Sequence, residues 1–503
     1  MRAILLLVLM CVCGAAAVAP QSPSPGACER LRSLPLPRGI VTAATTVVAT
    51  SQDLPGGSPE APASIPLPAS CRVLATIRPT PGSDIRIEVW MPEEQWNGKL
   101  LGTGNVNWCG GVNPLAMAMG LREYYATAGT DRGTRMCSVE DQVPEWVRFA
   151  DYPETLVDYG HRAVHEMTVS AKMLVASYYG TAPIRSYFVG GSSGGGQALM
   201  EAQRYPEDYD GIVAGAPTHD YTRFIAAGVW NRAQVAGVLP TEKRLLLHEA
   251  VLEACDSPEQ IGLLDDPRSC QFDPQLLMCS GDDTPQCLTR AQVEAARRMY
   301  AGPTNPRTGE VIYPGLERGS ERWWPGPNWQ VYFQYLVHKD PDWTFQRFDL
   351  DIDVALGDRV GAAALNAVDP DLRPFVARGG KLIIHHGWAD AVLAPQRTIS
   401  YYEDVVAVLG DRAGDSIRLF MVPRMSHGSG PGTDQYNMLA VLERWVEDGV
   451  GPDRVLAQHV TGSRITMERP LCPYPRLARW KGSGSKNDAD NFECALPQNV
   501  SSR

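Results

Sequence analysis

The sequence predicts an α/β fold built on a mainly parallel β-sheet. Short, almost wholly apolar runs at 211–217, 381–386 and 417–422 are typical of strands that are buried on both faces. Segments with helical periodicity, at 156–179 and 438–446, alternate with these runs. Strands that alternate with helices along a chain indicate parallel pairing.

A third observation is the turn at 190–196, which contains five glycines and two serines. It joins a β-favouring run at 186–189 to good helix formers at 197–204. A sharp strand-to-helix turn around Gly-x-Ser-x-Gly is the nucleophile elbow of α/β-hydrolases. Both Ser192 and Ser193 fit the pattern, and the position of the strand favours Ser192. The alternatives are a flexible loop without chemistry and a phosphate-binding turn, but no lysine follows to reach a phosphate.

Composition and the N-terminus indicate where the protein acts. The chain has 503 residues, enough for two or three domains, and its net charge of −11 offers no basic face to nucleic acid. Residues 1–19 combine Arg2, an apolar segment and a small-residue cleavage site, as a secretory signal peptide does. The apolar segment is too short to span a bilayer. We expect a secreted or periplasmic protein with no membrane association.

The chain before the Gly/Ser-rich turn contains three further features: a predicted strand, a Gly/Asn-rich loop and a pair of histidines. Residues 85–90 alternate apolar and polar, which predicts a strand. The Gly/Asn-rich loop at 102–111 could carry an oxyanion amide, although an ordinary turn explains it equally well. His161 and His165 have a metal-chelating spacing, but we expect a capped or solvated pair.

A long segment between two predicted core strands differs in character from its surroundings. It is rich in Pro and Gly and holds a cluster formed by Trp323, Trp324 and Trp329. We interpret 218–375 as an inserted lid domain. The tryptophans could grip an aromatic substrate, although core packing is the usual role of Trp. The α/β-hydrolase core would then consist of residues 20–217 and 376–503.

Three residues have the types and the order of a catalytic triad. A serine hydroxyl needs a base to take its proton and an acid to hold that base. Ser192 is followed by Asp390 and then His427, each just beyond a predicted strand. This is the order in α/β-hydrolases, and all three would meet at the carboxyl edge of a parallel sheet.

Several short motifs extend the pattern over nearly the whole mature chain: Trp96-Asn-Gly-Lys, Tyr187-Phe-Val-Gly-Gly-Ser-Ser-Gly-Gly, Asp208-Tyr-Asp-Gly-Ile-Val-Ala-Gly-Ala-Pro217, Cys287-Leu-Thr-Arg-Ala-Gln-Val, His386-Gly-Trp-Ala-Asp390 and Val422-Pro-Arg-Met-Ser-His427. Together they resemble the tannase/feruloyl esterase family of secreted α/β-hydrolases. The resemblance implies Ser192 as nucleophile, Asp390 as acid and His427 as base. It also implies oxyanion amides at Ser193 and Asn107.

The cysteines fit this resemblance. Ten remain after the signal peptide, an even number that in an exported protein indicates disulfides. The resemblance implies four pairs and leaves two cysteines, which we expect to form a bond particular to this chain. The implied pairs are Cys28–Cys71, Cys255–Cys270, Cys279–Cys287 and Cys472–Cys494, and the remaining pair is Cys109–Cys137.

The sequence departs from the family pattern at two places. The family usually has a disulfide between the residue before the nucleophile and the residue after the catalytic histidine, where this chain has Gly191 and Gly428. The family's calcium loop is also shortened. Asp256 remains and Glu259 could replace one ligand, but another carboxylate is absent, and calcium needs several oxygens. We therefore expect no required cofactor, with calcium at most a weakened site.

The predicted function is a serine carboxylic-ester hydrolase. Family members act on gallate, ferulate and terephthalate esters, and Val392 and Leu393, just after Asp390, would contact the substrate. We favour a small, neutral aromatic ester, and no protein partner is implied. The alternatives are a non-catalytic protein that binds an aromatic ligand on the same fold, and a serine peptidase.

Overall fold

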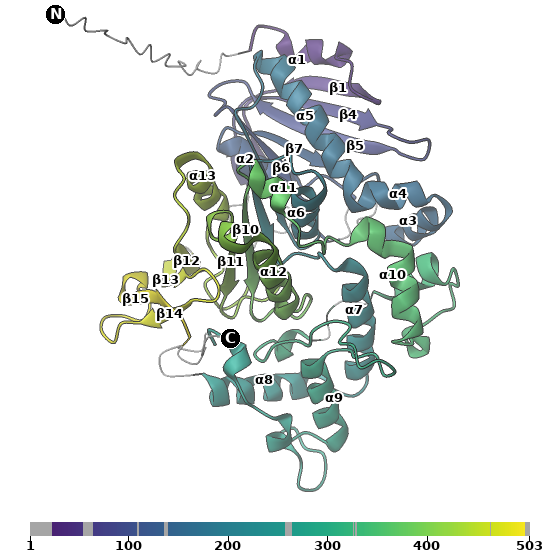
Figure 1. Cartoon of the computed structure of the whole chain (residues 1–503), viewed down its shortest axis with the longest axis vertical. Coiled ribbons are helices and arrows are strands. Elements are labelled where there is room, and N and C mark those ends of the chain that lie inside the picture. Colours follow the sequence, from purple (N-terminus) through teal and green to yellow (C-terminus); the bar gives the residue numbers. More distant parts are fainter. Residues whose placement is uncertain are drawn as a thin grey trace, which may run out of the picture.

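A computed structural model of the chain is organised around one nine-stranded sheet (Figure 1). It describes residues 23–53, 64–107, 110–134, 139–256, 264–324, 326, 329–462 and 464–497. The sheet order is β1-β4-β5-β7-β6-β8-β9-β10-β11. The strands from β7 to β11 pair in parallel, whereas β1, β4, β5 and β7 pair antiparallel. The strands are β1 (Gly39–Val47), β4 (Ser70–Ile77), β5 (Ile85–Pro92), β6 (Lys99–Thr103), β7 (Ala126–Thr130), β8 (Arg185–Gly191), β9 (Gly211–Gly215), β10 (Lys381–Gly387) and β11 (Ile417–Val422).

Helices cover the parallel strands, as an α/β-hydrolase fold requires. Every residue of β9 is buried, which explains the unbroken apolar pattern of this strand. The apolar faces of the helices complete the core against the sheet, with α5 lying across the antiparallel part (Figure 1). These helices are α1 (Ala27–Arg30), α2 (Pro114–Arg122), α5 (Ala163–Tyr179), α6 (Ser193–Arg204), α11 (Arg373–Ala377), α12 (Pro395–Leu409) and α13 (Met438–Asp448).

The segment between β9 and β10 forms a body of helices below the sheet in Figure 1. A second hydrophobic cluster fills it, separate from the cluster against the sheet. Residues on both sides of the segment, from Trp146 to Ala394, join this second cluster. The helices packed here are α3 (Val139–Asp151), α4 (Pro153–Val157), α7 (Tyr221–Val235), α8 (Thr241–Cys255), α9 (Arg290–Ala301) and α10 (Ile352–Leu365).

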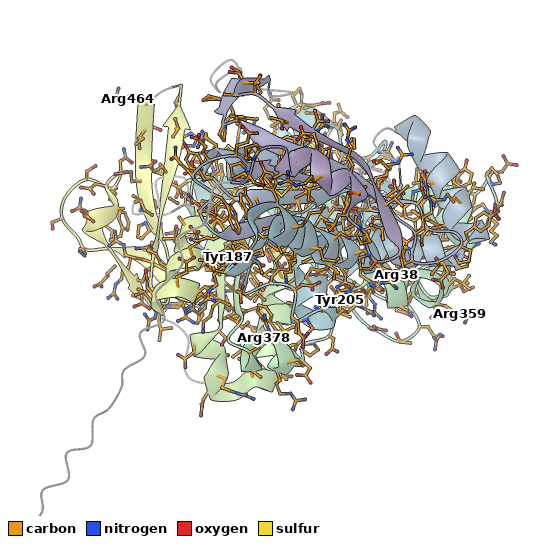
Figure 2. The ribbon with its side chains drawn as sticks, turned by 90° about the horizontal axis from the view of Figure 1, so that it is seen from above. Arg38, Tyr187, Tyr205, Arg359, Arg378 and Arg464 are labelled. Carbon is orange, nitrogen blue, oxygen red and sulfur yellow. A yellow bond between two sulfur atoms is a disulfide. The ribbon has the colours of Figure 1, made fainter. Side chains whose placement is uncertain are left out.

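Short two-stranded sheets occupy the rest of the described chain. The β12–β13 hairpin extends from the C-terminal part with Arg464 at its end (Figure 2). The short strands are β2 (Thr50–Asp53), β3 (Ser64–Leu67), β12 (Val455–Thr461), β13 (Arg464–Leu471), β14 (Leu477–Trp480) and β15 (Phe492–Ala495). Among the described residues, no helix is sufficiently long and apolar to cross a membrane.

The single helix expected over 156–179 is interrupted. A π-helical turn, Asp158–Arg162, separates α4 from α5. A Cβ on Gly160 would lie 2.0 Å from the carbonyl oxygen of Ala364, so the backbone of α10 approaches at this point. The sequence pattern shows the apolar face but not this close approach, which requires glycine.

The two histidines of this segment have separate partners. His161 Nδ1 lies 2.7 Å from the Tyr205 hydroxyl, and His165 Nδ1 lies 2.7 Å from Asp208 Oδ2. The ring of His165 also stacks on Tyr205, a residue labelled in Figure 2. Each histidine therefore has a hydrogen-bond partner of its own, as expected for a capped pair.

The described disulfides close loops of 8 to 43 residues. The structure has the four pairs that the resemblance implied: Cys28–Cys71, Cys255–Cys270, Cys279–Cys287 and Cys472–Cys494. The remaining expected pair, Cys109–Cys137, lies outside the described residues. The expected signal peptide at 1–19 lies outside them as well.

Candidate active site

The Gly/Ser-rich turn forms a tight strand-to-helix elbow between β8 and α6. Ser192 has φ 58° and ψ −119°, a conformation that costs free energy for any residue with a Cβ. Its amide is held by a hydrogen bond to the carbonyl of Gly215 at 2.8 Å. Gly190 is required beside it, because a Cβ there would lie 2.2 Å from the carbonyl oxygen of Gly194. The geometry therefore places Ser192 at the corner and Ser193 at the start of α6.

The structure brings Ser192, Asp390 and His427 together from the ends of three parallel strands. His427 Nε2 lies 2.8 Å from Ser192 Oγ, and His427 Nδ1 lies 2.7 Å from Asp390 Oδ2. Asp390 is fully buried, whereas about a quarter (24%) of the His427 side chain is exposed. The arrangement matches a nucleophile, a base and an orienting acid.

Four hydrogen bonds hold Asp390 as a carboxylate. The amides of Val392 and Leu393 donate to Oδ1 at 2.8 and 2.9 Å. His386 Nε2 lies 3.1 Å from Oδ2, the same oxygen that faces His427. Burial raises the pKa of Asp390, but the charge of His427 and the bonds from both histidines outweigh burial and hold that pKa well below its usual range.

The carboxylate in turn makes His427 more basic. Burial would lower the pKa of His427, whereas the charge of Asp390 and its hydrogen bond raise it, with a net rise above 6.5. An imidazole that accepts a proton more readily is a better base for the serine hydroxyl. The same interaction fixes the ring so that Nε2 faces Ser192.

Two further residues predicted from the sequence lie beside Ser192. Ser193 is the first residue of α6, where helix amides point toward a developing anion. Asn107 has φ 53° in the loop after β6 and, like Ser193, lines the cavity at Ser192. Two hydrogen bonds hold this loop against α6. The Asn105 amide donates to Gln197 Oε1 at 3.0 Å, and Gln197 Nε2 donates to Asn105 Oδ1 at 2.9 Å.

A small cavity opens at the nucleophile, with a volume of about 130 Å³. Its lining is largely aromatic on the side contributed by the segment between β9 and β10. Phe224 and Trp329 meet edge to face, with ring centroids 5.1 Å apart. The lining residues are Asn107, Ser192, Ser193, Thr218, Tyr221, Phe224, Trp329, Val392 and His427.

Of the residues predicted to contact a substrate, some line the cavity and others are buried away from it. Val392 and Trp329 line the cavity. Leu393 does not: its side chain is buried in the second hydrophobic cluster, and its contribution is the amide that binds Asp390. Trp324 is also buried, with its indole N–H donated to Ser320 Oγ at 2.9 Å.

Gly191 and Gly428, the two positions at which the resemblance implies cysteines, flank the reacting pair. A Cβ on Gly191 would have only the carbonyl oxygen of Gly215 nearby, at 3.9 Å. A Cβ on Gly428 would meet nothing within 4 Å, although φ is +87° there. The site is therefore open at both positions.

The residues available for calcium are few. Asp256 is described, but the loop after it, 257–263 with Glu259, lies outside the described residues. Within the described chain, one group of potential metal ligands is found: Cys279, Asp283 and Cys287. The two sulfurs are joined in a disulfide, and calcium prefers oxygen ligands, so this group is not a calcium site.

Two residues near the site were not predicted from the sequence. His386 belongs to the strand that precedes Asp390, but the sequence did not reveal that its ring turns back onto the carboxylate. Arg132 stands two residues after the end of β7 and lies buried beside Ser193. The signal for Arg132 was its position just after an apolar strand and before Gly133, at the same sheet edge as Ser192.

Known proteins resemble this chain in sequence and in fold. A model of the family described as tannase and feruloyl esterase matches residues 71–340 and 344–495. The chain belongs to the tannase and feruloyl esterase family. An uncharacterized esterase of Xanthomonas campestris pv. campestris is 35% identical, with 93% of this chain and 91% of that protein covered. The mono(2-hydroxyethyl) terephthalate hydrolase of Piscinibacter sakaiensis is 33% identical over 94% of this chain and 92% of that protein.

Solved structures of the family have the same architecture. Feruloyl esterase B from Aspergillus oryzae has a TM-score of 0.84 at 25% identity and covers 93% of this chain and 99% of that chain. Tannin acyl hydrolase from Aspergillus niger has a TM-score of 0.78 at 20% identity, over 95% and 97% of the two chains. The fold is that of an α/β-hydrolase, and this family member is a carboxylic ester hydrolase.

Proposed function

We propose that the protein hydrolyses esters of aromatic acids through an acyl-enzyme on Ser192. The observation that carries this proposal is the 2.8 Å contact between His427 Nε2 and Ser192 Oγ, with Asp390 behind the imidazole. A serine with such a base is an activated nucleophile for acyl transfer.

The reaction follows from this geometry. As Ser192 Oγ bonds to the ester carbonyl carbon, its proton moves to His427 Nε2 and the carbonyl electron pair moves onto oxygen. The amides of Ser193 and Asn107 receive that oxyanion. The electron pair then returns from the oxyanion to re-form the carbonyl, and the ester C–O bond breaks. His427 gives its proton to the departing alcohol oxygen, and the acyl group stays on Ser192. Water activated by His427 releases the acid by the reverse sequence.

The cavity supports an aromatic acyl group. Its volume of about 130 Å³ is close to the ~150 Å³ apolar cavity that accommodates a benzene ring. Phe224 and Trp329 present the ring faces and edges that aromatic groups pack against. Family members named for feruloyl esters and for a terephthalate ester agree with such a substrate. Val392 would contact the same acyl group, and we favour a neutral one.

The remaining architecture supports an exported enzyme with a lid. We propose that residues 218–375 form the lid, because they supply the aromatic wall and have their own hydrophobic cluster. Four disulfides are typical of proteins that fold in an oxidising compartment, so secretion or a periplasmic location is proposed.

Turnover of a substrate panel tests the proposal. Methyl ferulate, methyl gallate, p-nitrophenyl benzoate and p-nitrophenyl acetate would be compared for wild type, Ser192→Ala and Ser193→Ala. We expect Ser192→Ala to lose roughly 10⁴-fold in kcat, because triad members act as a unit. Ser193→Ala should lose far less, because only its amide is used. The reverse order of the two variants would refute Ser192 as nucleophile.

A second variant tests the aromatic wall. Trp329→Ala should raise KM for the ferulate and gallate esters and leave p-nitrophenyl acetate nearly unchanged, because the acetyl group has no ring to contact Trp329. Equal effects on acetyl and aromatic esters would remove the argument for an aromatic acyl group.

A further inference from the structure

Arg132 is a buried cation next to the candidate oxyanion site. It follows β7, has φ 58° and is 3% exposed. Its Nε donates to the carbonyl oxygen of Tyr159 at 2.9 Å, and its guanidinium carbon lies 3.6 Å from the centre of the Tyr159 ring. Backbone and ring contacts therefore fix the side chain in one orientation.

The charge of Arg132 has no acidic partner among the residues that the structure describes. No described Asp or Glu forms an ion pair with it. Its neighbours are phenols: the hydroxyls of Tyr159 and Tyr221 are 2.8 Å apart, and burial raises the pKa of both, so they are neutral at physiological pH. A buried positive charge without a counter-charge is unfavourable in the resting protein.

One end of the guanidinium contacts the residue next to the candidate nucleophile. Arg132 Nη1 lies 3.5 Å from Ser193 Oγ, and Ser193 lines the cavity together with Ser192. The proposed reaction creates a negative charge at the amide of Ser193 when the carbonyl electron pair moves onto oxygen. A fixed cation stabilises charge that appears only in the transition state, and does so strongly where water is excluded.

We propose that Arg132 is a positioning residue whose charge, unpaired among the described residues, is matched by the oxyanion in the transition state. This inference rests on the proposed acyl-enzyme mechanism. Arg132 does not bond to the substrate in this scheme. It acts through its electric field at the oxyanion, and its position beside Ser193 keeps the charge near the amide that receives that oxyanion.

Three variants test the proposal. Arg132→Met keeps a long apolar side chain without the charge, and Arg132→Lys keeps the charge without the planar group. Arg469→Met is the matched control, because Arg469 is also 3% exposed and lies over an aromatic ring, that of Phe492, at 4.0 Å. A fluorophosphonate that labels Ser192 would count the folded sites in each preparation, so that kcat is expressed per site.

We expect Arg132→Met to reduce kcat for p-nitrophenyl benzoate by roughly 10- to 100-fold, with KM changed less than about twofold. Arg132→Lys should recover a large part of that loss, and Arg469→Met should keep wild-type kcat per site. The inhibition constant of phenylboronic acid, whose serine adduct is a tetrahedral anion, should rise with Arg132→Met in proportion to the lost kcat.

Several outcomes would overturn the inference. Wild-type kcat per labelled site in Arg132→Met would show that the charge does not act on the transition state. Loss of kcat in Arg132→Lys equal to that in Arg132→Met would point to shape rather than charge. A rise in KM confined to monomethyl terephthalate would make Arg132 a receptor for a substrate carboxylate. Full activity of Ser192→Ala would instead refute the acyl-enzyme mechanism itself, which separates the two failures.

Discussion

Gly191 and Gly428 flank the Ser192–His427 contact and offer a site for an engineered disulfide. The change is Gly191→Cys together with Gly428→Cys. A Cβ would be accommodated at both positions, because the nearest atom is 3.9 Å away at Gly191 and nothing lies within 4 Å at Gly428. The two residues adjoin side chains that are 2.8 Å apart. We expect the two thiols to oxidise and the enzyme to stay active.

The expected gain in the free energy of unfolding is the difference between two opposing contributions. A bond that closes a loop of about 237 residues constrains the unfolded chain by ~5.5 kcal/mol in the chain-entropy model. Gly428 has φ +87°, and an L-residue in that region costs about 1–2 kcal/mol. The difference is about 4 kcal/mol before any strain in the bond. For a chain of this length, about 1 kcal/mol corresponds to one degree, so Tm should rise by about 4 °C.

The measurements are the free-thiol count, Tm with and without reductant, and turnover of p-nitrophenyl benzoate. Gly191→Ala with Gly428→Ala is the matched control: it carries the same backbone cost without a bond, and its Tm should fall by about 1–2 °C. Each single cysteine variant should also fail to gain stability. Two free thiols under oxidising conditions would show that the positions are not neighbours, and the placement of His427 beside Ser192 would be wrong.

Three further predictions concern protonation, the carboxylate and calcium. Catalysis needs neutral His427, and its pKa is raised, so kcat/KM should fall as pH drops through a value above 6.5. Asp390→Asn should move the acidic fall in kcat/KM to lower pH. A wild-type midpoint at or below 6.5 would contradict the argument that Asp390 raises the pKa of His427. His386→Phe removes the imidazole that lies 3.1 Å from Asp390 Oδ2. We expect kcat to fall and the free energy of unfolding, measured by urea titration, to fall by about 1–3 kcal/mol. Unchanged values would show that His386 does not hold Asp390 in place. EDTA should change Tm little, because the loop after Asp256 lacks a full oxygen set; a large drop that calcium reverses would show that the site is retained.

Local patterns in the sequence were sufficient for the framework of the protein. The apolar runs at 211–217, 381–386 and 417–422 predict buried parallel strands because a strand covered on both faces has no polar side. The Gly-x-Ser-x-Gly pattern predicts the elbow at Ser192 because only glycine fits so close a turn. Ser192, Asp390 and His427 each stand just beyond a predicted strand, and this position predicts that they meet at one edge of the sheet.

Only the tertiary structure decided which way individual side chains face. Leu393 adjoins Val392 in sequence, yet it packs into a hydrophobic cluster while Val392 lines the cavity. His386 turns onto Asp390, and Arg132 reaches Ser193 across 61 positions of the chain. Periodicity reports which face of an element is apolar, but a contact between distant segments depends on how the elements pack. The presence of a buried charge near the proposed oxyanion site is therefore a property of packing that no local pattern contains.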